Sequence, residues 1–432
     1  MKNMTNMMLK VQEPRLSKAA WMTVGITFLV QCVLVCIYWD YPDGPDSIGY
    51  IKHALDNYAI GSTYPSRLNL KDQFLQAPGM VNFLILQHAV FGTTDFRIAK
   101  IINLILSLGI VANVYYLGRR FFSQGAACIA VIVYSLLPTN LFAPIHLLTE
   151  LPYLFLTLTG FSLSLQQKGR FIVGAGILYA IAHTFRPLVL AFLLVSVVLY
   201  LMERRRILSY LLLVLPYVFI LWGIGQHNKS NTGYFVTSST TGGYNLIMTA
   251  NDHAMARPEF SVFLDSTNIA FIPDRAERSF AEKDSIYKAR AIQWIRRHPR
   301  RYFMLYVEKI GRLWSGDTWS MPKFSKWDDW DYIRTLPDPG HLPLIRRCIQ
   351  AVEGLPYYVM MLFFFAALVW NRREIFSRKG LFLLIILLGT AGTCLFTVEV
   401  RFHYPYLFAV VLWTAYGIYT RRMRKKASPE AS

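Results

Sequence analysis

The feature that most restricts the fold of this chain is a series of long apolar runs that contain almost no charge. An apolar run of about 20 residues is long enough to cross a lipid bilayer as an α-helix. Only 16% of the residues are charged, whereas about a quarter is usual in soluble proteins. The sequence therefore predicts an all-α polytopic membrane protein with about ten transmembrane helices. The predicted spans are 20–39, 97–117, 122–142, 145–165, 171–185, 188–202, 207–225, 354–370, 381–398 and 404–420.

The net positive charge of the chain, +19, is concentrated in the short segments on one side of these spans. Short loops rich in Lys and Arg stay in the cytoplasm, so both termini are predicted to be cytoplasmic. Nucleic-acid binding is not indicated, because no soluble module combines a basic face with stacking aromatic residues. The predicted cytoplasmic segments are 1–19, 118–121, 166–170, 203–206, 371–379 and 421–432.

Two long segments, 40–96 and 226–353, are then left on the extracytoplasmic side. Loops longer than about 15 residues usually carry function or structure of their own. We therefore divide the chain into an N-terminal transmembrane catalytic module (1–225, with the first outer loop), a large extracytoplasmic loop, and C-terminal transmembrane helices with a basic cytoplasmic tail (354–432). An amphipathic helix starting at Pro299 is predicted to lie on the membrane interface.

The first outer segment opens with three carboxylates, Asp40, Asp43 and Asp46, close to the end of a predicted membrane helix. A short helix over 47–58 is predicted to follow. Asp46 is therefore a candidate helix N-cap as well as a candidate functional group. The later stretch 74–91 is apolar but interrupted by polar residues, so it is predicted to lie on the interface rather than to span the membrane.

Charged residues near the outer ends of the spans are further candidates, because charge within a bilayer is costly. Glu150 follows His146 by four residues, which would place both on one helix face and leaves a divalent metal site open. Arg186 lies between two short spans, and Arg401 lies just before the last span, where it could simply pair with Glu399. Carboxylates and guanidinium groups at one membrane surface suit a substrate with an anionic head group.

Several short elements in this sequence follow one another in a recognisable order. The first is Asp46-Ser47-Ile48-Gly49-Tyr50, which is similar to a D-[ES]-x-x-Y element. The others are Ala77-Pro78-Gly79, Phe91-Gly92, Arg97, Leu117-Gly118-Arg119-Arg120, Thr149-Glu150, Arg186-Pro187, Gly243-Tyr244-Asn245-Leu246 and Arg401-Phe402-His403-Tyr404-Pro405. Together they resemble the elements of membrane glycosyltransferases of the GT-C fold that use polyprenyl-phosphate sugars, of the protein mannosyltransferase and aminoarabinose transferase type. The chain departs from many of these proteins at Gln76, where they have a basic residue.

The resemblance implies a transferase in the plasma (inner) membrane that moves a sugar from a polyprenyl-phosphate donor to a hydroxyl of a glycan, lipid or protein acceptor on the extracytoplasmic side, with inversion. Such a reaction needs a base for the acceptor proton and cations for the leaving phosphate. Asp46 is the expected base, Glu150 is expected to position the acceptor or a basic residue, and Arg186 and Arg401 are expected to bind the donor phosphate. No metal or other cofactor is expected. The other implied substrate-binding residues are Asp43, Tyr50, His146, Tyr244, Asn245 and His403.

Two other classes of function stay open at this point. A transporter or lipid flippase would be expected to show inverted repeats and polar residues at the bilayer midplane, whereas the polar residues here gather near one face. A polysaccharide polymerase or ligase would use a related lipid-linked donor but would transfer a glycan chain. An assay of the donor separates these classes.

Overall fold

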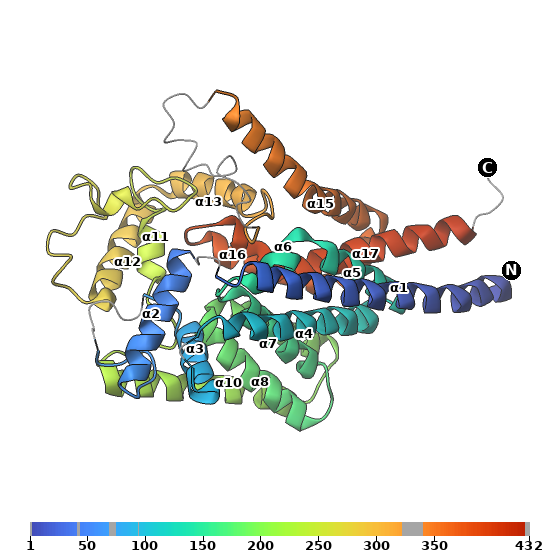
Figure 1. The fold of residues 1–432 in the computed structure, drawn as a ribbon, viewed down its shortest axis with the longest axis horizontal. Helices are drawn as coiled ribbons and strands as arrows, with labels where there is room; N and C mark the ends of the chain where they lie inside the picture. Colours follow the sequence, from blue (N-terminus) through green and yellow to red (C-terminus); the bar gives the residue numbers. More distant parts are fainter. Residues whose placement is uncertain (1, 41–43, 69–74, 94, 322–339, 428–432) are drawn as a thin grey trace.

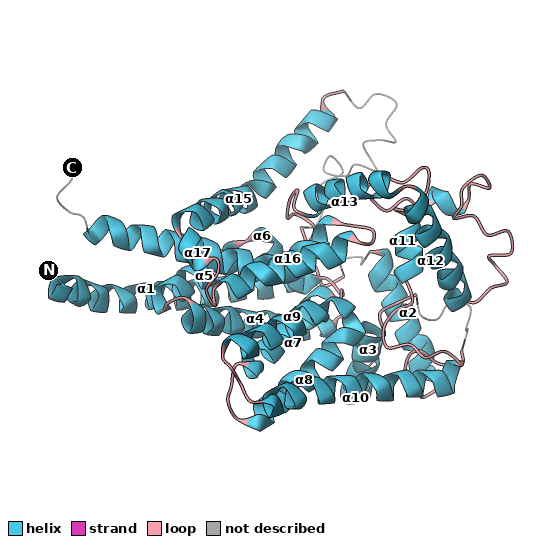
Figure 2. Ribbon diagram, turned by 180° about the vertical axis from the view of Figure 1, so that it is seen from behind, coloured by secondary structure: helices cyan, strands magenta, loops and turns pink. Residues whose placement is uncertain are grey.

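The chain is described by a computed structural model that covers residues 2–40, 44–68, 75–93, 95–321 and 340–427, the side chains of 2–14, 342 and 426–427 excepted. The described residues form helices joined by turns and loops, with no strand among them (Figure 2). The elements are α1 (Lys2–Ile37), α2 (Pro45–Ala59), α3 (Pro78–Phe91), α4 (Ile98–Phe121), α5 (Gln124–Leu136), α6 (Pro138–Phe142), η1 (Ala143–Ile145), α7 (Glu150–Ser164), α8 (Gly169–Phe185), η2 (Pro187–Val189), α9 (Leu190–Met202), α10 (Ile207–Thr232), α11 (Gly242–Ile247), η3 (Ser261–Phe263), α12 (Phe280–Arg297), α13 (Pro299–Leu313), α15 (Leu342–Trp370), η5 (Arg372–Glu374), α16 (Gly380–Cys394), η6 (Val400–His403) and α17 (Tyr404–Ala427).

A helix lies at every predicted span, which confirms an all-helical chain with several apolar helices. Four helices in the described ranges are long and apolar enough to cross a bilayer: Arg15–Ile37, Ile98–Phe121, Ile207–Thr232 and Pro343–Trp370. The bent pair Gln124–Leu136 and Pro138–Ile145 raises the number to 5 if it counts as one span. Because α7, α8, α9 and α16 have only 13 to 17 residues, the number of about ten spans and their orientation stay predictions.

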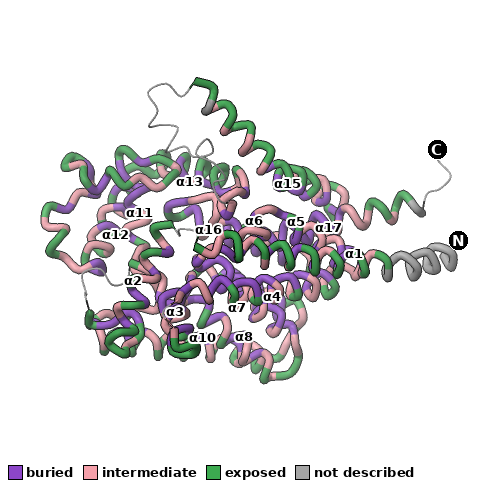
Figure 3. Tube along the Cα trace, in the orientation of Figure 1, coloured by how far each residue is buried: buried purple, intermediate pink, exposed green. Residues whose placement is uncertain are grey.

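The helices pack into one bundle in which α1, α4, α5 and α17 run side by side (Figure 1). Helix α7 packs between α4 and α8, α8 packs on α10, and α15 packs on α17. Buried residues are concentrated along the middle of the bundle, whereas α1, α10 and α15 expose much of their outer faces (Figure 3). Those faces are apolar, with Ile26 and Phe219 about 60% exposed. Exposed apolar faces of this kind are expected where a helix meets lipid.

The large outer loop contains a second, smaller core at the end of the bundle opposite the two termini (Figure 1). Helices α11, α12 and α13 supply some of its buried residues, among them Ile247, Tyr287, Trp294 and Leu305, and the stretch 248–272 supplies the others. Helix α12 begins at Phe280, because Ser279 and Glu282 form a capping box there. Helix α13 begins at Pro299, as predicted; its place at a membrane interface stays a prediction, as does that of α3.

The boundaries of the three predicted segments differ slightly from the helix ends. Helix α10 continues beyond 225 to Thr232, where Gly233 ends it in the left-handed conformation with φ +85°. Helix α15 begins at Leu342, before the predicted boundary at 354. The division into three functional modules is not tested by these positions.

Candidate functional site

Four of the predicted charged residues are carried by separate elements whose ends meet at one place. Asp46 lies in the first turn of α2, and Glu150 is the first residue of α7. Arg186 follows α8 and precedes Pro187, which forces an extended backbone on it (φ −151°, ψ 123°). Arg401 lies in the short helix η6. Carboxylates in the first turn of a helix are favoured by its dipole, so the local sequence supports the positions of both acids.

Asp46 is not the N-cap of α2, which was the structural alternative for this residue. The N-cap is Gly44, and no side chain caps this helix. The carboxylate of Asp46 instead accepts a hydrogen bond from Nη2 of Arg401, with Oδ2 and Nη2 2.5 Å apart. Its side chain is 44% exposed. Asp46 is therefore paired with a guanidinium group and is still open to solvent.

Glu150 and Arg186 form a buried ion pair, with Oε1 and Nη2 2.5 Å apart. The Glu150 side chain is only 1% exposed. Nε of Arg186 also donates a hydrogen bond to Oγ1 of Thr149 at 2.9 Å. A buried carboxylate costs several kcal/mol unless a cation compensates it, so Glu150 fixes the position of the Arg186 guanidinium group.

Arg401 links Asp46 and Glu399 to the ion pair of Glu150 and Arg186. Its Nε atom lies 2.7 Å from Oε2 of Glu399 and 3.9 Å from Oε1 of Glu150. The expected pair with Glu399 is thus present together with the contact to Asp46. Burial alone lowers the pKa of Arg401, but the charges of Glu150, Glu399 and Asp46 outweigh it and raise that pKa above its usual range. Arg401 is held charged among three carboxylates.

Phe402, which was named in a sequence element but not predicted as a site residue, contacts both arginines. The ring of Phe402 has the guanidinium carbon of Arg186 at 5.1 Å from its centroid and that of Arg401 at 5.4 Å. Cation–π contacts of this kind hold guanidinium planes in place. Only its position next to Arg401 could have drawn attention to Phe402, because the chain is rich in phenylalanine throughout.

Tyr50 is the fifth predicted residue at this place. It is buried one turn after Asp46 in α2. Burial raises the pKa of the Tyr50 phenol above its usual range, and the nearby charges of Asp46 and Glu150 raise it further. We refer to Asp46, Tyr50, Glu150, Arg186 and Arg401 as the ionic cluster.

Three other predicted site residues lie elsewhere or outside the described part of the chain. Tyr244 stacks on Phe263 in the core of the outer loop, with centroids 4.6 Å apart, and Asn245 is its neighbour in α11. Asp43 falls outside the described residues. None of these positions tests a role in substrate binding.

His146 and Glu150 do not share a helix face, contrary to the sequence prediction. Helix η1 ends at Ile145 and α7 begins at Glu150, so the four residues between them are not helical. Pro152 favours a helix start at this point, because it lies in the first turn of α7, where proline is best tolerated. Within the described ranges, no three His, Cys, Asp or Glu side chains are grouped as a metal site requires.

Residues 314–320, of which Asp317 and Ser320 are buried, contact the turns next to the ionic cluster. The imidazole Nε2 of His146 lies 2.7 Å from the carbonyl oxygen of Ser320. Asp317 lies 3.3 Å from Nε2 of His403, and both side chains are at most 1% exposed. His146 and His403 thus connect this segment to the turns that carry Glu150 and Arg401. Sequence reasoning missed Asp317, since the segment has no periodicity or motif.

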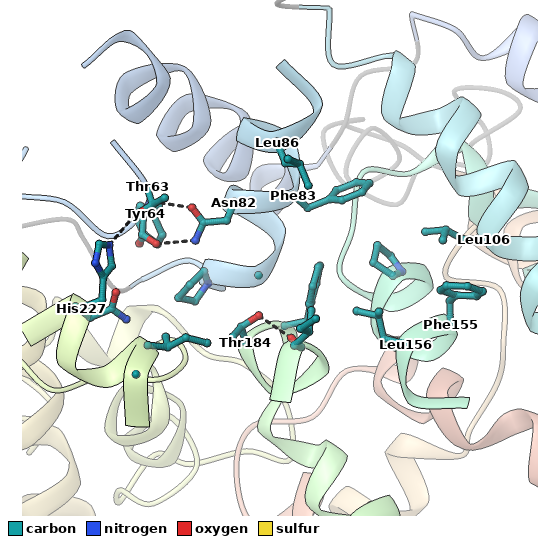
Figure 4. A pocket seen from close by; sticks show the side chains of 18 residues that line it. Thr63, Tyr64, Asn82, Phe83, Leu86, Leu106, Phe155, Leu156, Thr184 and His227 are labelled. Carbon is teal, nitrogen blue, oxygen red and sulfur yellow. Dashed lines mark hydrogen bonds between the residues drawn. The ribbon is translucent and has the colours of Figure 1, made fainter. Parts of the chain in front are cut away.

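An apolar cavity of about 590 Å³ lies beside the cluster. Thr184 and Phe185, which line it, directly precede Arg186. Figure 4 shows the side chains around it, with Phe83 and Phe155 on its apolar part. Thr63 and His227 lie together at the other end, joined by a hydrogen bond of 3.0 Å. The cavity can hold a largely apolar ligand whose polar group lies either toward Arg186 or near Thr63 and His227.

No family model matches the sequence, and no curated protein is similar enough to it to match. The structure is similar to that of an oligosaccharyltransferase from Archaeoglobus fulgidus in the apo form, with a TM-score of 0.52 and 11% identity over 96% of this chain and 52% of the other. It is also similar, with a TM-score of 0.42 and 15% identity, to ArnT from Cupriavidus metallidurans bound to undecaprenyl phosphate, over 95% of this chain and 79% of ArnT.

The likeness to the oligosaccharyltransferase extends over nearly the whole chain and confirms the fold that the motifs predict. At 11% identity it establishes the fold alone. The chain spans about half the length of that protein, 52%.

Proposed function

We propose that this protein is a membrane glycosyltransferase that moves a sugar from a polyprenyl-phosphate donor to an acceptor hydroxyl. The observation that carries the proposal is the ionic cluster, in which two arginines lie beside a solvent-exposed carboxylate, with Arg186 directly after two residues that line an apolar cavity. A phosphate group fits the arginines, a polyprenyl chain fits the cavity, and the carboxylate is left for the acceptor.

The donor phosphate is bound between Arg186 and Arg401. Guanidinium groups suit phosphate, because they present several N–H donors in a fixed plane. Phe402 and the buried Glu150 hold these two planes before the donor arrives. Preorganised cations stabilise the charge that grows on a leaving phosphate without having to reorient. Glu150 is thus a positioning residue for the arginines, one of the two roles that the sequence analysis left open for it.

Asp46 acts as the general base. It is the most exposed carboxylate of the ionic cluster, whereas Glu150 is enclosed. When the phosphate takes over Arg401, the carboxylate of Asp46 is released to accept a proton. The acceptor oxygen then attacks the anomeric carbon, the bond from this carbon to the phosphate oxygen breaks, and the electron pair leaves with the phosphate. The acceptor proton passes to Asp46. Attack opposite the phosphate inverts the anomeric centre.

The proposal also includes the location of the reaction. The helix ends opposite the ionic cluster carry the excess of positive charge. This supports an orientation in which the cluster faces the extracytoplasmic side of the plasma membrane. The acceptor is a glycan, lipid or protein hydroxyl that reaches this surface, and the residues Tyr244 and Asn245 of the outer loop are proposed to contact it.

The test is a transfer assay with membranes that contain the protein and a panel of radiolabelled polyprenyl-phosphate sugars. We expect one label to move covalently to an acceptor, and we expect Asp46→Asn to slow this transfer about 10²–10⁴-fold, the usual value of general-base help. Asp40→Asn is the matched control, because Asp40 is an exposed carboxylate that pairs with Arg97. Label that crosses the membrane without covalent transfer, or normal turnover by Asp46→Asn, contradicts the proposal.

A further inference from the structure

A second cavity, of about 650 Å³, lies at the end of the bundle opposite the ionic cluster. Four arginines from three different places in the chain line it: Arg120 in the last turn of α4, Arg205 and Arg206 between α9 and α10, and Arg378 before α16. Glu203 is the only acid among the lining residues. The cavity therefore carries a net positive charge, and nothing in the proposed transfer reaction uses it.

The lining arginines differ in how far the protein itself occupies them. The guanidinium group of Arg205 is occupied by protein partners. It pairs with Glu203 at 2.9 Å and donates hydrogen bonds to the carbonyl oxygens of Ser164, Leu165 and Gln166. Arg378 shares Glu203, with Nη1 and Oε1 3.2 Å apart.

Arg120 and Arg206 have no carboxylate partner within the described part of the chain, and both are exposed. The first turns of α8 and α10, which also border the cavity, contain no acid. Their partial positive charge adds to that of the arginines. Positive charge in this cavity thus exceeds what the single acid can neutralise.

One wall of the cavity is apolar and continues into the surface of α10. Leu208 and Leu212 line the cavity. Further along the same helix, Leu215 and Phe219 are 43% and 63% exposed. Only 11% of the apolar window of α10 is buried, less than in the other spanning helices of the described chain. An exposed apolar helix face of this length is expected to meet the acyl chains of the bilayer.

We propose that this cavity binds the phosphate group of an anionic phospholipid, whose acyl chains lie along α10. Basic pockets between the cytoplasmic ends of membrane helices suit lipid phosphate groups. A lipid phosphate ester and a free phosphate anion would both offer the arginines the same kind of negatively charged group. The apolar wall favours the lipid, because a soluble phosphate would gain nothing from Leu208 and Leu212.

The test compares two triple variants of the purified full chain. The site variant replaces three lining arginines: R120Q, R206Q and R378Q. The matched control replaces a neighbouring arginine in each of the same three places that does not line the cavity: R119Q, R204Q and R373Q. Both variants lose the same charge, so the cytoplasmic excess that orients the helices falls equally in both.

Binding is measured by titration with three probes: dioctanoyl-phosphatidylglycerol, dioctanoyl-phosphatidylcholine and inorganic phosphate. We expect the wild type and the control variant to bind phosphatidylglycerol more tightly than phosphatidylcholine. The site variant is expected to bind phosphatidylglycerol on the order of 100-fold more weakly, since each basic residue contributes about fivefold (about 1 kcal/mol). Inorganic phosphate is expected to bind more weakly than phosphatidylglycerol and to lose affinity in the site variant.

Phosphatidylglycerol affinity that is equal in the site and control variants overturns the proposal. Equal affinity of the wild type for phosphatidylglycerol and phosphatidylcholine also overturns it. If inorganic phosphate binds the wild type as tightly as phosphatidylglycerol, and only the site variant loses both, the cavity is a phosphate site but the assignment to a lipid is wrong.

Discussion

The buried pair of Glu150 and Arg186 gives the sharpest prediction about stability. Removing one partner of a buried ion pair costs about 3–5 kcal/mol, because the other charge is left in a dry site. Arg186→Gln leaves Glu150 with Arg401 at 3.9 Å and the Thr149 hydroxyl, so we expect the lower end, about 3 kcal/mol. Glu150→Gln leaves Arg186 with a partly exposed guanidinium group and should cost only about 1–2 kcal/mol. The double variant should be more stable than Arg186→Gln.

The assay is equilibrium unfolding of the purified protein in one detergent at neutral pH, followed by tryptophan fluorescence. Arg97→Gln is the control, because Arg97 and Asp40 are also 2.5 Å apart but are 43% and 80% exposed. Because water screens exposed charges, the loss of the Arg97 ion pairs with Asp40 and Asp95 should cost much less than the loss of the buried pair. If Arg186→Gln is as stable as the wild type, or if the double variant is the least stable of the set, the reasoning from burial is wrong.

Four further outcomes are expected. Reporter fusions after Arg206 and near Asp284 should report opposite sides of the membrane; the same side for both contradicts the predicted topology. Asp284 accepts a hydrogen bond from the amide of Tyr244, and burial raises its pKa to about 6. The charged form is thus disfavoured in the folded state, so protection of the Tyr244 amide from hydrogen exchange should fall by about 1 kcal/mol between pH 5 and pH 8. This loss should disappear in Asp284→Asn. Arg401→Lys should recover only part of the donor binding that Arg401→Ala loses, because an ammonium group cannot make a bidentate contact. Asp317→Asn should destabilise the protein by about 1–3 kcal/mol in the same unfolding assay, since the buried imidazole of His403 loses the carboxylate that lies 3.3 Å from it.

The sequence predicted the helices and the residues of the ionic cluster for one physical reason. Helices that cross a bilayer alternate in direction, so charged residues at every second turn return to the same surface. Asp46, Glu150, Arg186 and Arg401 all lie at such turns, and the structure brings them into one cluster. The order of helices and turns along the chain was therefore enough to predict that these four residues lie at the same end of the bundle.

The details of the cluster depended on features that carry no periodic signal. Pro45 occupies the first position of α2 and moves the cap to Gly44, which frees Asp46 for Arg401. Lys100, near the start of α4, is 1% exposed and donates hydrogen bonds to the carbonyl oxygens of Tyr38 and Trp39. Such contacts join residues about 60 positions apart or more, and no local pattern announces them.

The proposed binding of a polyprenyl donor phosphate by Arg186 and Arg401 can be tested without knowing the sugar. The affinities of the wild type and of Arg401→Gln are measured for a polyprenyl phosphate and for the polyprenol of the same length. The wild type should bind the phosphate about 10–100-fold more tightly than the alcohol, the value of a charge-assisted contact of about 1.5–3 kcal/mol. In Arg401→Gln most of this preference should be lost, while the affinity for the alcohol stays the same. Equal binding of both lipids by the wild type, or an unchanged preference in the variant, would contradict the claim.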